Sequence, residues 1–316
     1  MRRRLRATLL VLASAAWTPW VITWLVDLDR LDWRIPAAQA FLPYVAAGTA
    51  AALLLAATVR NRQATALAAL GLLVLLAPRT SRVTANHQPA ADGPVVTIAT
   101  ANVFVGEGST SDLADLLRRH HVDVLAIQEN TPEFDARAQG AGIREQLPSW
   151  LSDPDPRPGT AGLALLSRWP IDPVPPATGD HRSIGGLIHI PGASRTLHLR
   201  SVHPPPPFRS TTVPCWQRCT RTLARTRQTT TDVILAGDYN ATLDHHPLRD
   251  LLASGFRDAA EQTGHAWRPT WSRNALLRLS LDHILVTDRI AVEQVTTHDL
   301  HRSDHDVVIT RLRLPR

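Results

Sequence analysis

The N-terminal quarter of the chain contains long apolar stretches, and these limit its fold more than any other feature. Residues 5–26 and 37–59 are each long enough to span the roughly 30 Å hydrocarbon core of a bilayer as an α-helix. A third stretch, residues 64–77, has only about 14 residues, a length that equally suits a buried or interfacial helix. The sequence therefore predicts that residues 1–78 are a membrane anchor with two or three transmembrane helices.

Arginines flank these stretches in an asymmetric way. Four arginines lie in "MRRRLR" before the first stretch, and "RNR" separates the second stretch from the third. Basic residues stay on the cytoplasmic side of membrane proteins, so three spans place everything after Arg79 outside. The first stretch also fits a signal peptide, because a basic start, an apolar run and "ASA" precede Ala16; this alternative leaves the rest of the chain on the same side. We therefore expect a multi-pass protein of the cell membrane with an extracytoplasmic domain.

The charge of the remaining chain is balanced. All 34 basic residues are arginine, and the formal net charge of the whole chain is +6. From Pro94 onward, 24 arginines are matched by 24 aspartates and glutamates, so the positive excess belongs to the N-terminal stretches. This balance argues against a broad basic surface for nucleic acid.

Cysteine content excludes one class of metal site. The chain has only two cysteines, Cys215 and Cys219, so a zinc site built from several thiolates is excluded. An extracytoplasmic location permits a disulfide between them, but the closed loop is too short to stabilise the fold much. A zinc cluster of His298, His301 and His305 is an alternative use of the C-terminal histidines.

After a polar, unpatterned segment at residues 79–93, which we interpret as a linker, short apolar runs alternate with helical or loop segments. The runs are rich in β-branched residues and bounded by turn signals, as is typical of strands. Strands are expected at 95–103, 123–128, 162–167, 196–203, 232–238, 281–286 and 306–314, and helices at 111–120, after Pro214 and at 246–255. Many strands with few helices favour two packed sheets with helices outside.

Polar side chains stand at the ends of six of these predicted strands. They are Asn102, Glu129, His203, Asp238 with Asn240, Asp282, and Asp304 with His305. Each has another explanation when taken alone. "GDYN" around Asp238 can be a turn, and His203 can merely enter the polyproline stretch "PPPP". Carboxylates buried apart from a metal or a partner are costly, so together these residues predict one shared cleft.

In this order the residues resemble the endonuclease/exonuclease/phosphatase superfamily, which includes pancreatic DNase, abasic-site endonucleases, neutral sphingomyelinases and inositol-phosphate 5-phosphatases. The resemblance covers residues 94–316. It implies an α+β fold, a four-layer α/β/β/α sandwich, placed here after the N-terminal transmembrane helices. It also implies hydrolysis of a phosphodiester or phosphomonoester by in-line attack of water.

The resemblance implies a role for each residue of the set. Asn102, Glu129 and Asp304 correspond to ligands of a divalent cation, and hard oxygen donors suit Mg²⁺ or Mn²⁺. Asp282 and His305 correspond to an Asp–His pair that deprotonates water or stabilises the phosphate, with Asp238 as the rival general base. Asn240 is expected to orient the water or a phosphate oxygen, and His203 to contact a phosphate oxygen or assist the leaving group.

The substrate stays open between a lipid headgroup, a small molecule and a nucleic acid. Tethering to a membrane raises encounters with membrane phosphoesters, and the balanced charge disfavours duplex DNA, so we expect a preference for small or lipid phosphoesters. The alternatives are an extracytoplasmic nuclease and a non-catalytic binding module tethered to the membrane. The oligomeric state is not predicted.

Overall fold

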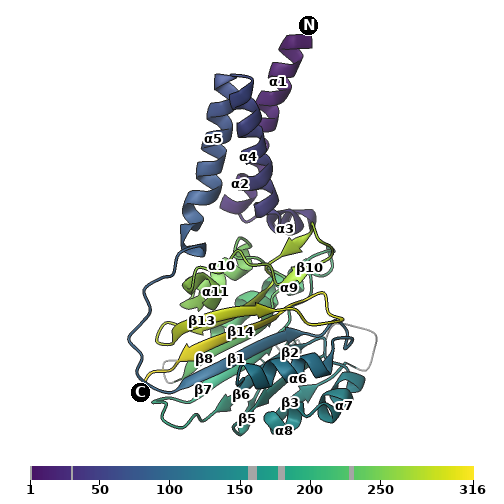
Figure 1. Ribbon diagram of the computed structural model, residues 1–316, viewed down its shortest axis with the longest axis vertical. Coiled ribbons are helices and arrows are strands. Elements are labelled where there is room, and N and C mark those ends of the chain that lie inside the picture. The colour runs from purple at the N-terminus through teal and green to yellow at the C-terminus, as the bar shows by residue number, and fades with distance from the viewer. Residues whose placement is uncertain (1, 30, 156–161, 177–181, 228–230) are drawn as a thin grey trace.

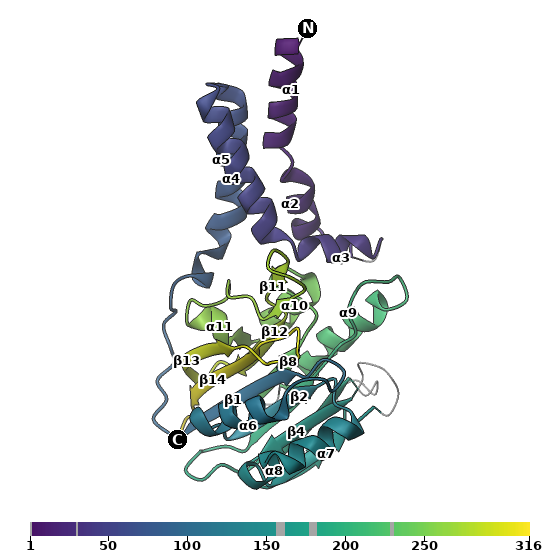
Figure 2. The same cartoon turned by 45° about the vertical axis from the view of Figure 1, so that its right-hand side comes forward.

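A computed structural model describes residues 2–29, 31–155, 162–176, 182–227 and 231–316 (Figure 1). An elongated helical bundle at the N-terminus projects from a layered domain of strands and helices (Figures 1 and 2). The bundle contains α1 (Arg2–Ser14), α2 (Thr18–Leu25), α3 (Arg34–Gln39), α4 (Leu42–Thr58) and α5 (Arg62–Leu76), and η1 (Ala77–Arg82) continues α5 as a 3₁₀-helix.

Two helices of this bundle are long and apolar enough to cross a membrane, Arg4–Leu25 and Arg62–Arg82. The second of these is longer than its apolar run, because Asn61 caps it by accepting a hydrogen bond from the Ala64 N–H and η1 extends it at the other end. The predicted span 37–59 is instead divided into α3 and the shorter α4, since the chain turns at Ala40 and a new helix begins at Leu42, with Pro43 in its first turn.

The domain contains two six-stranded sheets. In the first sheet the order is β13 (Ala291–His298), β14 (Val307–Arg313), β1 (Val95–Asn102), β2 (Val124–Gln128), β4 (Leu163–Ser167) and β3 (Ser149–Asp153). In the second it is β5 (Ile171–Val174), β6 (Ser183–Ile188), β7 (Leu197–Val202), β8 (Asp232–Asp238), β12 (Asp282–Thr287) and β9 (Phe256–Asp258). A small pair, β10 (Trp271–Ser272) and β11 (Arg278–Leu279), lies apart.

One parallel pair in each sheet aligns polar strand ends. Within these sheets β1 and β2 run parallel, as do β7 and β8, and the other pairs are antiparallel. The carboxyl ends of β1, β2, β7 and β8 therefore bring the residues that follow them to one edge of the sandwich.

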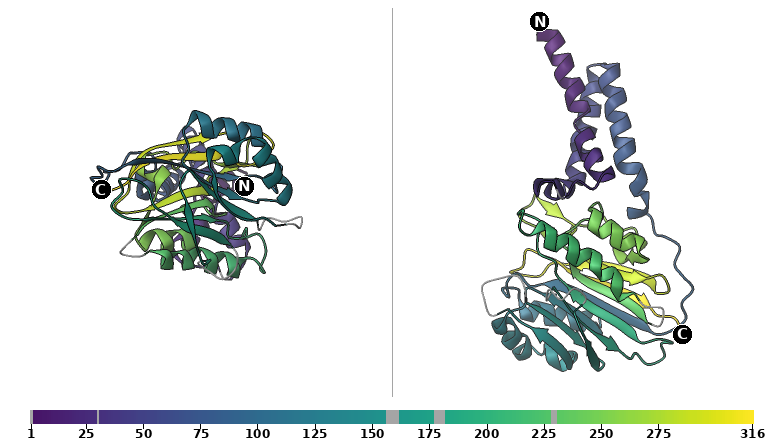
Figure 3. Two further views of the ribbon diagram at one scale, coloured as in Figure 1. Left: turned by 90° about the horizontal axis from the view of Figure 1, so that it is seen from below. Right: turned by 180° about the vertical axis from the view of Figure 1, so that it is seen from behind.

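Alternation along the strands builds three apolar layers. On β1, Val96 and Ile98 point into the core between the sheets, while Ala99 and Ala101 join the core under the outer helices. The first sheet is covered by α6 (Thr110–Arg119), α7 (Pro132–Gly140) and α8 (Ile143–Gln146), and the second by α9 (Val213–Thr222), η2 (Leu223–Thr226), α10 (His246–Ala253) and α11 (Ala259–Gln262). Figure 3 shows the sheets between these helices, which confirms the four-layer α/β/β/α sandwich.

The segment predicted as a linker packs on the domain. Its first residues lie in η1, where Arg79 and Arg82 are buried and both contact Asp244 of the domain. Further along, the Asn86 N–H donates to the Gln262 carbonyl and the Gly93 N–H to the Leu314 carbonyl. The sequence shows that residues 79–93 are polar, but it cannot show which groups of the domain they contact. For this reason the sequence pattern indicates only a linker.

The α2–α3 region also contacts the domain directly. Arg249 Nη1 donates to the Trp24 carbonyl at 2.6 Å, and a 2.8 Å hydrogen bond joins His245 Nε2 to the Pro36 carbonyl. The Tyr44 hydroxyl donates to the Leu276 carbonyl at 2.6 Å. These contacts hold α2, α3 and α4, respectively, against the domain.

Candidate active site

The polar strand ends converge at one edge of the sandwich. Asn102 ends β1 in the first sheet, and Asp238 ends β8 in the second. Asp282 begins β12 directly opposite Asp238 in the antiparallel register. The site is therefore formed between two sheets whose packing is set by the apolar core beneath them.

Asn102 connects the carboxylates of both sheets. Its buried Nδ2 donates to Glu129 Oε1 and to Asp238 Oδ2, each at 3.1 Å. Its Oδ1 accepts the Phe104 N–H at 3.0 Å, and the second lone pair of this oxygen is left for another partner.

Glu129 is held in a strained loop environment. Its own φ is +59°, and φ is also positive at Phe104 (+47°) and Val105 (+50°), a conformation that is costly for a β-branched residue. The Val105 N–H donates to Glu129 Oε2 at 2.7 Å, so this strained turn fixes the carboxylate. Backbone strain of this kind is concentrated at functional sites.

Asp282 and His305 form the expected pair. A 2.8 Å hydrogen bond joins His305 Nδ1 to Asp282 Oδ2, which also accepts the Thr270 hydroxyl at 2.6 Å. Burial lowers the pKa of His305, but the carboxylates of Asp282 and Asp238 outweigh burial and raise it to about 10. The imidazole is therefore held as a cation near neutral pH.

Asp238 lies between two imidazoles. Its Oδ2 is 3.4 Å from His203 Nε2 and 3.6 Å from His305 Nε2, and its Oδ1 accepts the Asn240 N–H at 2.7 Å. Burial raises the pKa of Asp238, but these neighbours outweigh burial and lower it to about 2. The same ion pair with Asp238 raises the pKa of His203 against the opposing effect of burial. Asn240, at φ +48°, donates its Nδ2 to the Pro204 carbonyl.

The charges of the site fit a divalent cation. Four carboxylates (Glu129, Asp238, Asp282 and Asp304) face two imidazoles, so the acidic groups outnumber the imidazoles by two. Asp304 accepts the Trp271 indole N–H through Oδ2 at 2.8 Å, while its buried Oδ1 has no hydrogen-bond partner among the described residues. Glu129 and Asp304 both line the same pocket. The cluster of Asp238, Asp282 and His305 is also close enough for a metal, but its contacts are explained by the Asp282–His305 hydrogen bond.

The pocket above these groups has a volume of about 430 Å³ and two contrasting walls. One wall is polar and carries Glu129, His203, Asp238, Asn240, Asp304 and His305. The other is mostly apolar and includes Phe104, Phe208, Leu279 and Leu281, together with Pro36, Ala37, Ala40 and Phe41 from α3 and its C-terminal turn, but His245 and Arg273 also line the pocket. The N-terminal bundle therefore contributes directly to the pocket.

The contacts of the described residues support neither a zinc cluster of His298, His301 and His305 nor a disulfide between Cys215 and Cys219. His298 packs its ring against His120 with centroids 4.3 Å apart, and neither His298 nor His301 belongs to a ligand cluster among the described residues. Cys215 Sγ and Cys219 Sγ are 3.2 Å apart, which is longer than a disulfide bond of about 2.05 Å.

Two further residues support the site. The Ser303 hydroxyl donates to the Asn102 carbonyl and accepts the His305 N–H, which ties the last loop to β1. Arg182 has a buried Nη1 with no hydrogen-bond partner among the described residues and lies close enough to His203 to oppose its protonation. Ser303 lies next to Asp304 and His305 in "SDH", whereas Arg182 stands at no predicted strand end, so the pattern that identified the other residues does not reach it.

A two-sheet sandwich with acidic and histidine side chains gathered at this edge defines a metal-dependent hydrolase of phosphoesters. The chain belongs to the endonuclease/exonuclease/phosphatase family, whose sequence model matches residues 99–305.

Solved structures share the fold at low sequence identity. An endonuclease/exonuclease/phosphatase from Beutenbergia cavernae is 15% identical, with a TM-score of 0.55 over 70% of this chain and 72% of that chain. A humanized D. rerio TDP2 is 18% identical, with a TM-score of 0.54 over 69% of this chain and 98% of that chain. An AP endonuclease from Archaeoglobus fulgidus is 17% identical, with a TM-score of 0.53 over 68% and 98%. A comparison with curated proteins finds no match.

Proposed function

We propose that the protein is a membrane-anchored phosphoesterase that uses Mg²⁺ or Mn²⁺ and hydrolyses a phosphoester carrying an apolar group, such as a membrane lipid. The observation that carries this proposal is the pocket with one acidic wall and one apolar wall, the second built partly by α3. A phosphate fits the polar side, and an acyl or isoprenoid chain fits the apolar side.

Glu129, Asp304 and the free lone pair of Asn102 Oδ1 are the groups that would hold the cation. When bound, the cation polarises a phosphoryl oxygen and stabilises charge on the leaving oxygen. Asn102 keeps Glu129 and Asp238 at a fixed separation, and the Trp271 indole orients Asp304. These contacts preorganise the site before substrate arrives.

The protonation states favour Asp238 as the group that orients and deprotonates the attacking water. Its carboxylate is ionised and faces the pocket, whereas His305 is a cation whose Nδ1 is occupied by Asp282. The cationic His305 can then donate to a phosphoryl oxygen, together with His203, whose pKa Asp238 raises against the effect of burial, and so stabilise the charge that develops during in-line attack. Asn240 is available on the same wall to orient the water or a phosphate oxygen.

The surroundings of the pocket support a lipid substrate. Phe208 and Phe104 are 56% and 44% exposed, and Leu276, near the adjoining β10–β11 pair, is 84% exposed. Figure 2 places α3 between the domain and the helices that are apolar enough to cross a membrane. Exposed apolar side chains grouped at the mouth of a pocket mark a site for an apolar ligand or a membrane surface.

We expect the full chain in detergent–lipid micelles, with Mg²⁺ or Mn²⁺, to hydrolyse phospholipids or isoprenoid phosphates more efficiently than plasmid DNA. A panel of lipids, inositol phosphates, bis-p-nitrophenyl phosphate and plasmid DNA measures this preference, with EDTA as the metal-free control. Efficient cleavage of plasmid that falls steeply with salt, without turnover of lipid, would instead make the protein a nuclease.

Phe208→Ser is expected to lower kcat/KM for a lipid substrate roughly tenfold, because part of the contact worth about 1.5–3 kcal/mol for a buried phenylalanine is lost. Hydrolysis of bis-p-nitrophenyl phosphate should change little, since that compound has no long chain. Val83→Ser removes an equally exposed apolar side chain outside the pocket and serves as the control. Equal losses on both substrates would argue against the apolar wall as a chain-binding surface.

We propose three membrane crossings with the domain outside, with α4 as a third crossing that is shorter than the two helices long enough to span. The arginines in the first turns of α1 and those at the turn from α4 into α5 fall at the end of the bundle farther from the domain (Figure 1). Positive residues favour the cytoplasmic side, so protease added to intact spheroplasts should digest the domain. Protection of the domain until lysis would contradict this topology.

A further inference from the structure

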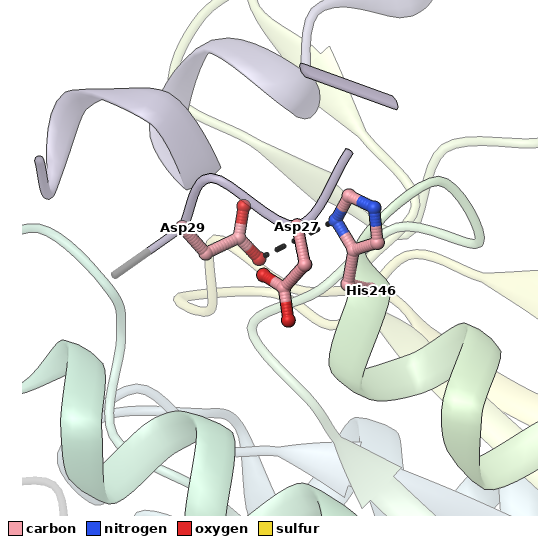
Figure 4. Close-up of side chains that lie close together, drawn as sticks. All are labelled: Asp27, Asp29 and His246. Carbon is pink, nitrogen blue, oxygen red and sulfur yellow. Dashed lines mark ion pairs between the residues drawn. The ribbon is translucent and has the colours of Figure 1, made fainter. Parts of the chain in front are cut away.

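A second cluster of ligand-type side chains lies where the bundle meets the domain, away from the phosphoesterase pocket. Asp27 and Asp29 belong to the connection between α2 and α3, and His246 is the first residue of α10 (Figure 4). One ligand atom from each residue lies within 4.8 Å of the other two. Segments more than 200 positions apart in the chain thus present two carboxylates and an imidazole to the same point.

Two of these side chains are buried without the partners that burial requires. Asp29 is 1% exposed; its Oδ1 accepts Gln39 Nε2 at 2.9 Å, but its Oδ2 has no hydrogen-bond partner among the described residues. His246 is 9% exposed, and neither ring nitrogen has such a partner within the same part of the chain. Buried polar groups are almost always satisfied, so these atoms indicate a ligand.

The separation of the two atoms suits a bridging ion. Asp29 Oδ2 and His246 Nδ1 are 3.8 Å apart, which is too far for a hydrogen bond. Two donors that each lie about 2.0–2.2 Å from one tetrahedral cation are separated by about 3.3–3.6 Å, so a small shift of either side chain brings both atoms into range. Figure 4 shows the His246 ring and the Asp29 carboxylate facing each other, with Asp27 beside them.

A hydrogen bond from Arg221 orients the carboxylate of Asp27. Arg221 Nη2 donates to its Oδ2 at 2.7 Å, and Arg221 Nε also donates to Asp250 at 2.6 Å. The contact with Arg221 leaves the other carboxylate oxygen of Asp27 available. Such hydrogen bonds commonly fix the direction of a metal ligand.

We propose that Asp27, Asp29 and His246 form a divalent-cation site, separate from the phosphoesterase centre, that takes Zn²⁺ or a similar borderline transition metal. Imidazole selects such metals over Mg²⁺ and Ca²⁺, which prefer oxygen ligands. A fourth ligand can be water, because Asp29 and Arg221 also line a cavity of about 710 Å³. The ion clamps the α2–α3 connection to α10 and so keeps α3 in place as a wall of the active-site pocket.

Metal content of the full chain, purified in detergent, tests this proposal. A Glu129→Gln background and excess Mg²⁺ weaken competing binding at the phosphoesterase centre, and Zn²⁺ that stays bound in the ligand variants below measures what remains there. After chelation and addition of Zn²⁺, one equivalent should remain bound on dialysis, as measured by inductively coupled plasma mass spectrometry. Asp29→Asn and His246→Gln should each weaken binding by more than the roughly 10- to 100-fold typical of changes in outer partners. His189→Gln, at an exposed histidine, is the matched control and should bind normally.

Thermal unfolding gives a second readout that does not depend on activity. Zn²⁺ should raise the Tm of the control protein and leave the Tm of the ligand variants unchanged, because an ion that binds only the folded state stabilises it. Asp27→Asn, at a partly exposed position, covers the case in which the buried variants fail to fold. A folded protein that retains no Zn²⁺, or variants that bind it as tightly as the control, would overturn the proposal and leave a direct Asp29–His246 ion pair.

Discussion

Glu129→Gln is expected to lower kcat/KM for every phosphoester substrate at least about a thousandfold, because the contribution of a bound cation to the transition state is several kcal/mol. Glutamine has nearly the same shape and can still accept one of the two hydrogen bonds that Glu129 receives from Asn102 Nδ2 and the Val105 N–H. The fold should therefore persist. Steady-state kinetics over a range of Mg²⁺ and Mn²⁺ concentrations measure the effect.

A control variant separates the loss of a metal-binding carboxylate from the general loss of one negative charge. Glu133→Gln removes an exposed carboxylate from α7, outside the pocket, and should leave kcat/KM unchanged. Asp304→Asn should resemble Glu129→Gln, since its Oδ1 is the unpartnered oxygen of the site. Turnover near the wild-type level in either active-site variant, with the protein folded, would show that these carboxylates do not hold the metal.

The sequence predicts the centre of the sandwich well because buried strands carry a strong signal. Strands β1, β2, β4, β7, β8, β12 and β14 all coincide with apolar runs that the sequence marks. Every strand between β14 and β4 in the first sheet, and between β7 and β12 in the second, is of this kind. A strand packed on both faces needs apolar residues throughout, so its run is conspicuous.

The strands that the sequence pattern misses lie at or near sheet edges. β3, β5, β9 and β13 are edge strands of the two sheets, and β6 lies next to the edge. β5 contains Pro173, which is tolerated at an edge because a missing N–H is not needed there, and β13 mixes apolar with charged and polar residues. Such segments are fixed by their neighbours, and the local sequence alone does not specify them.

The same distinction applies to the site. Asn102 and Asp238 lie at the ends of strands that the apolar runs predict. Because those strands could be predicted, the group of residues at their ends could be predicted too. The apolar wall was not, since it joins α3 to loops distant in sequence such as that of Phe208. The spacing of apolar residues within one segment does not show which other segment of the chain will pack against it.

Asp244→Ala is expected to destabilise the protein by about 3–5 kcal/mol, because it leaves two buried arginines without their counter-ion. Asp244 Oδ1 accepts Arg79 Nε at 2.8 Å and Arg82 Nη2 at 3.0 Å, and its Oδ2 accepts Arg82 Nη1 at 2.7 Å. The three side chains are at most 10% exposed. Arg79 also lies over the rings of Trp20 and Trp24, so it cannot turn to solvent without breaking these contacts.

The pKa of Asp244 determines the pH at which the loss of stability in Asp244→Ala should be measured. Burial raises the pKa of Asp244, but the arginines outweigh burial and lower it below its ordinary value. A lowered pKa in the folded state means that the stabilisation is complete above the unfolded value of about 3.9 and is lost as pH falls through the folded pKa. Thermal or denaturant unfolding of the full chain at pH 7 in detergent therefore captures the whole contribution.

Asp115→Ala provides the control, because it removes an exposed ion pair with Arg118 and should cost less than about 1 kcal/mol. Beyond stability, loss of Asp244 releases η1 from the loop before α10, so protease should cut between the bundle and the domain more readily in Asp244→Ala than in Asp115→Ala. The prediction fails if the free energy of unfolding of Asp244→Ala is within about 1 kcal/mol of the wild-type value and the variant resists protease equally. In that case Arg79 and Arg82 must find other partners, and their ion pairs with Asp244 would not be what joins the helical bundle to the domain.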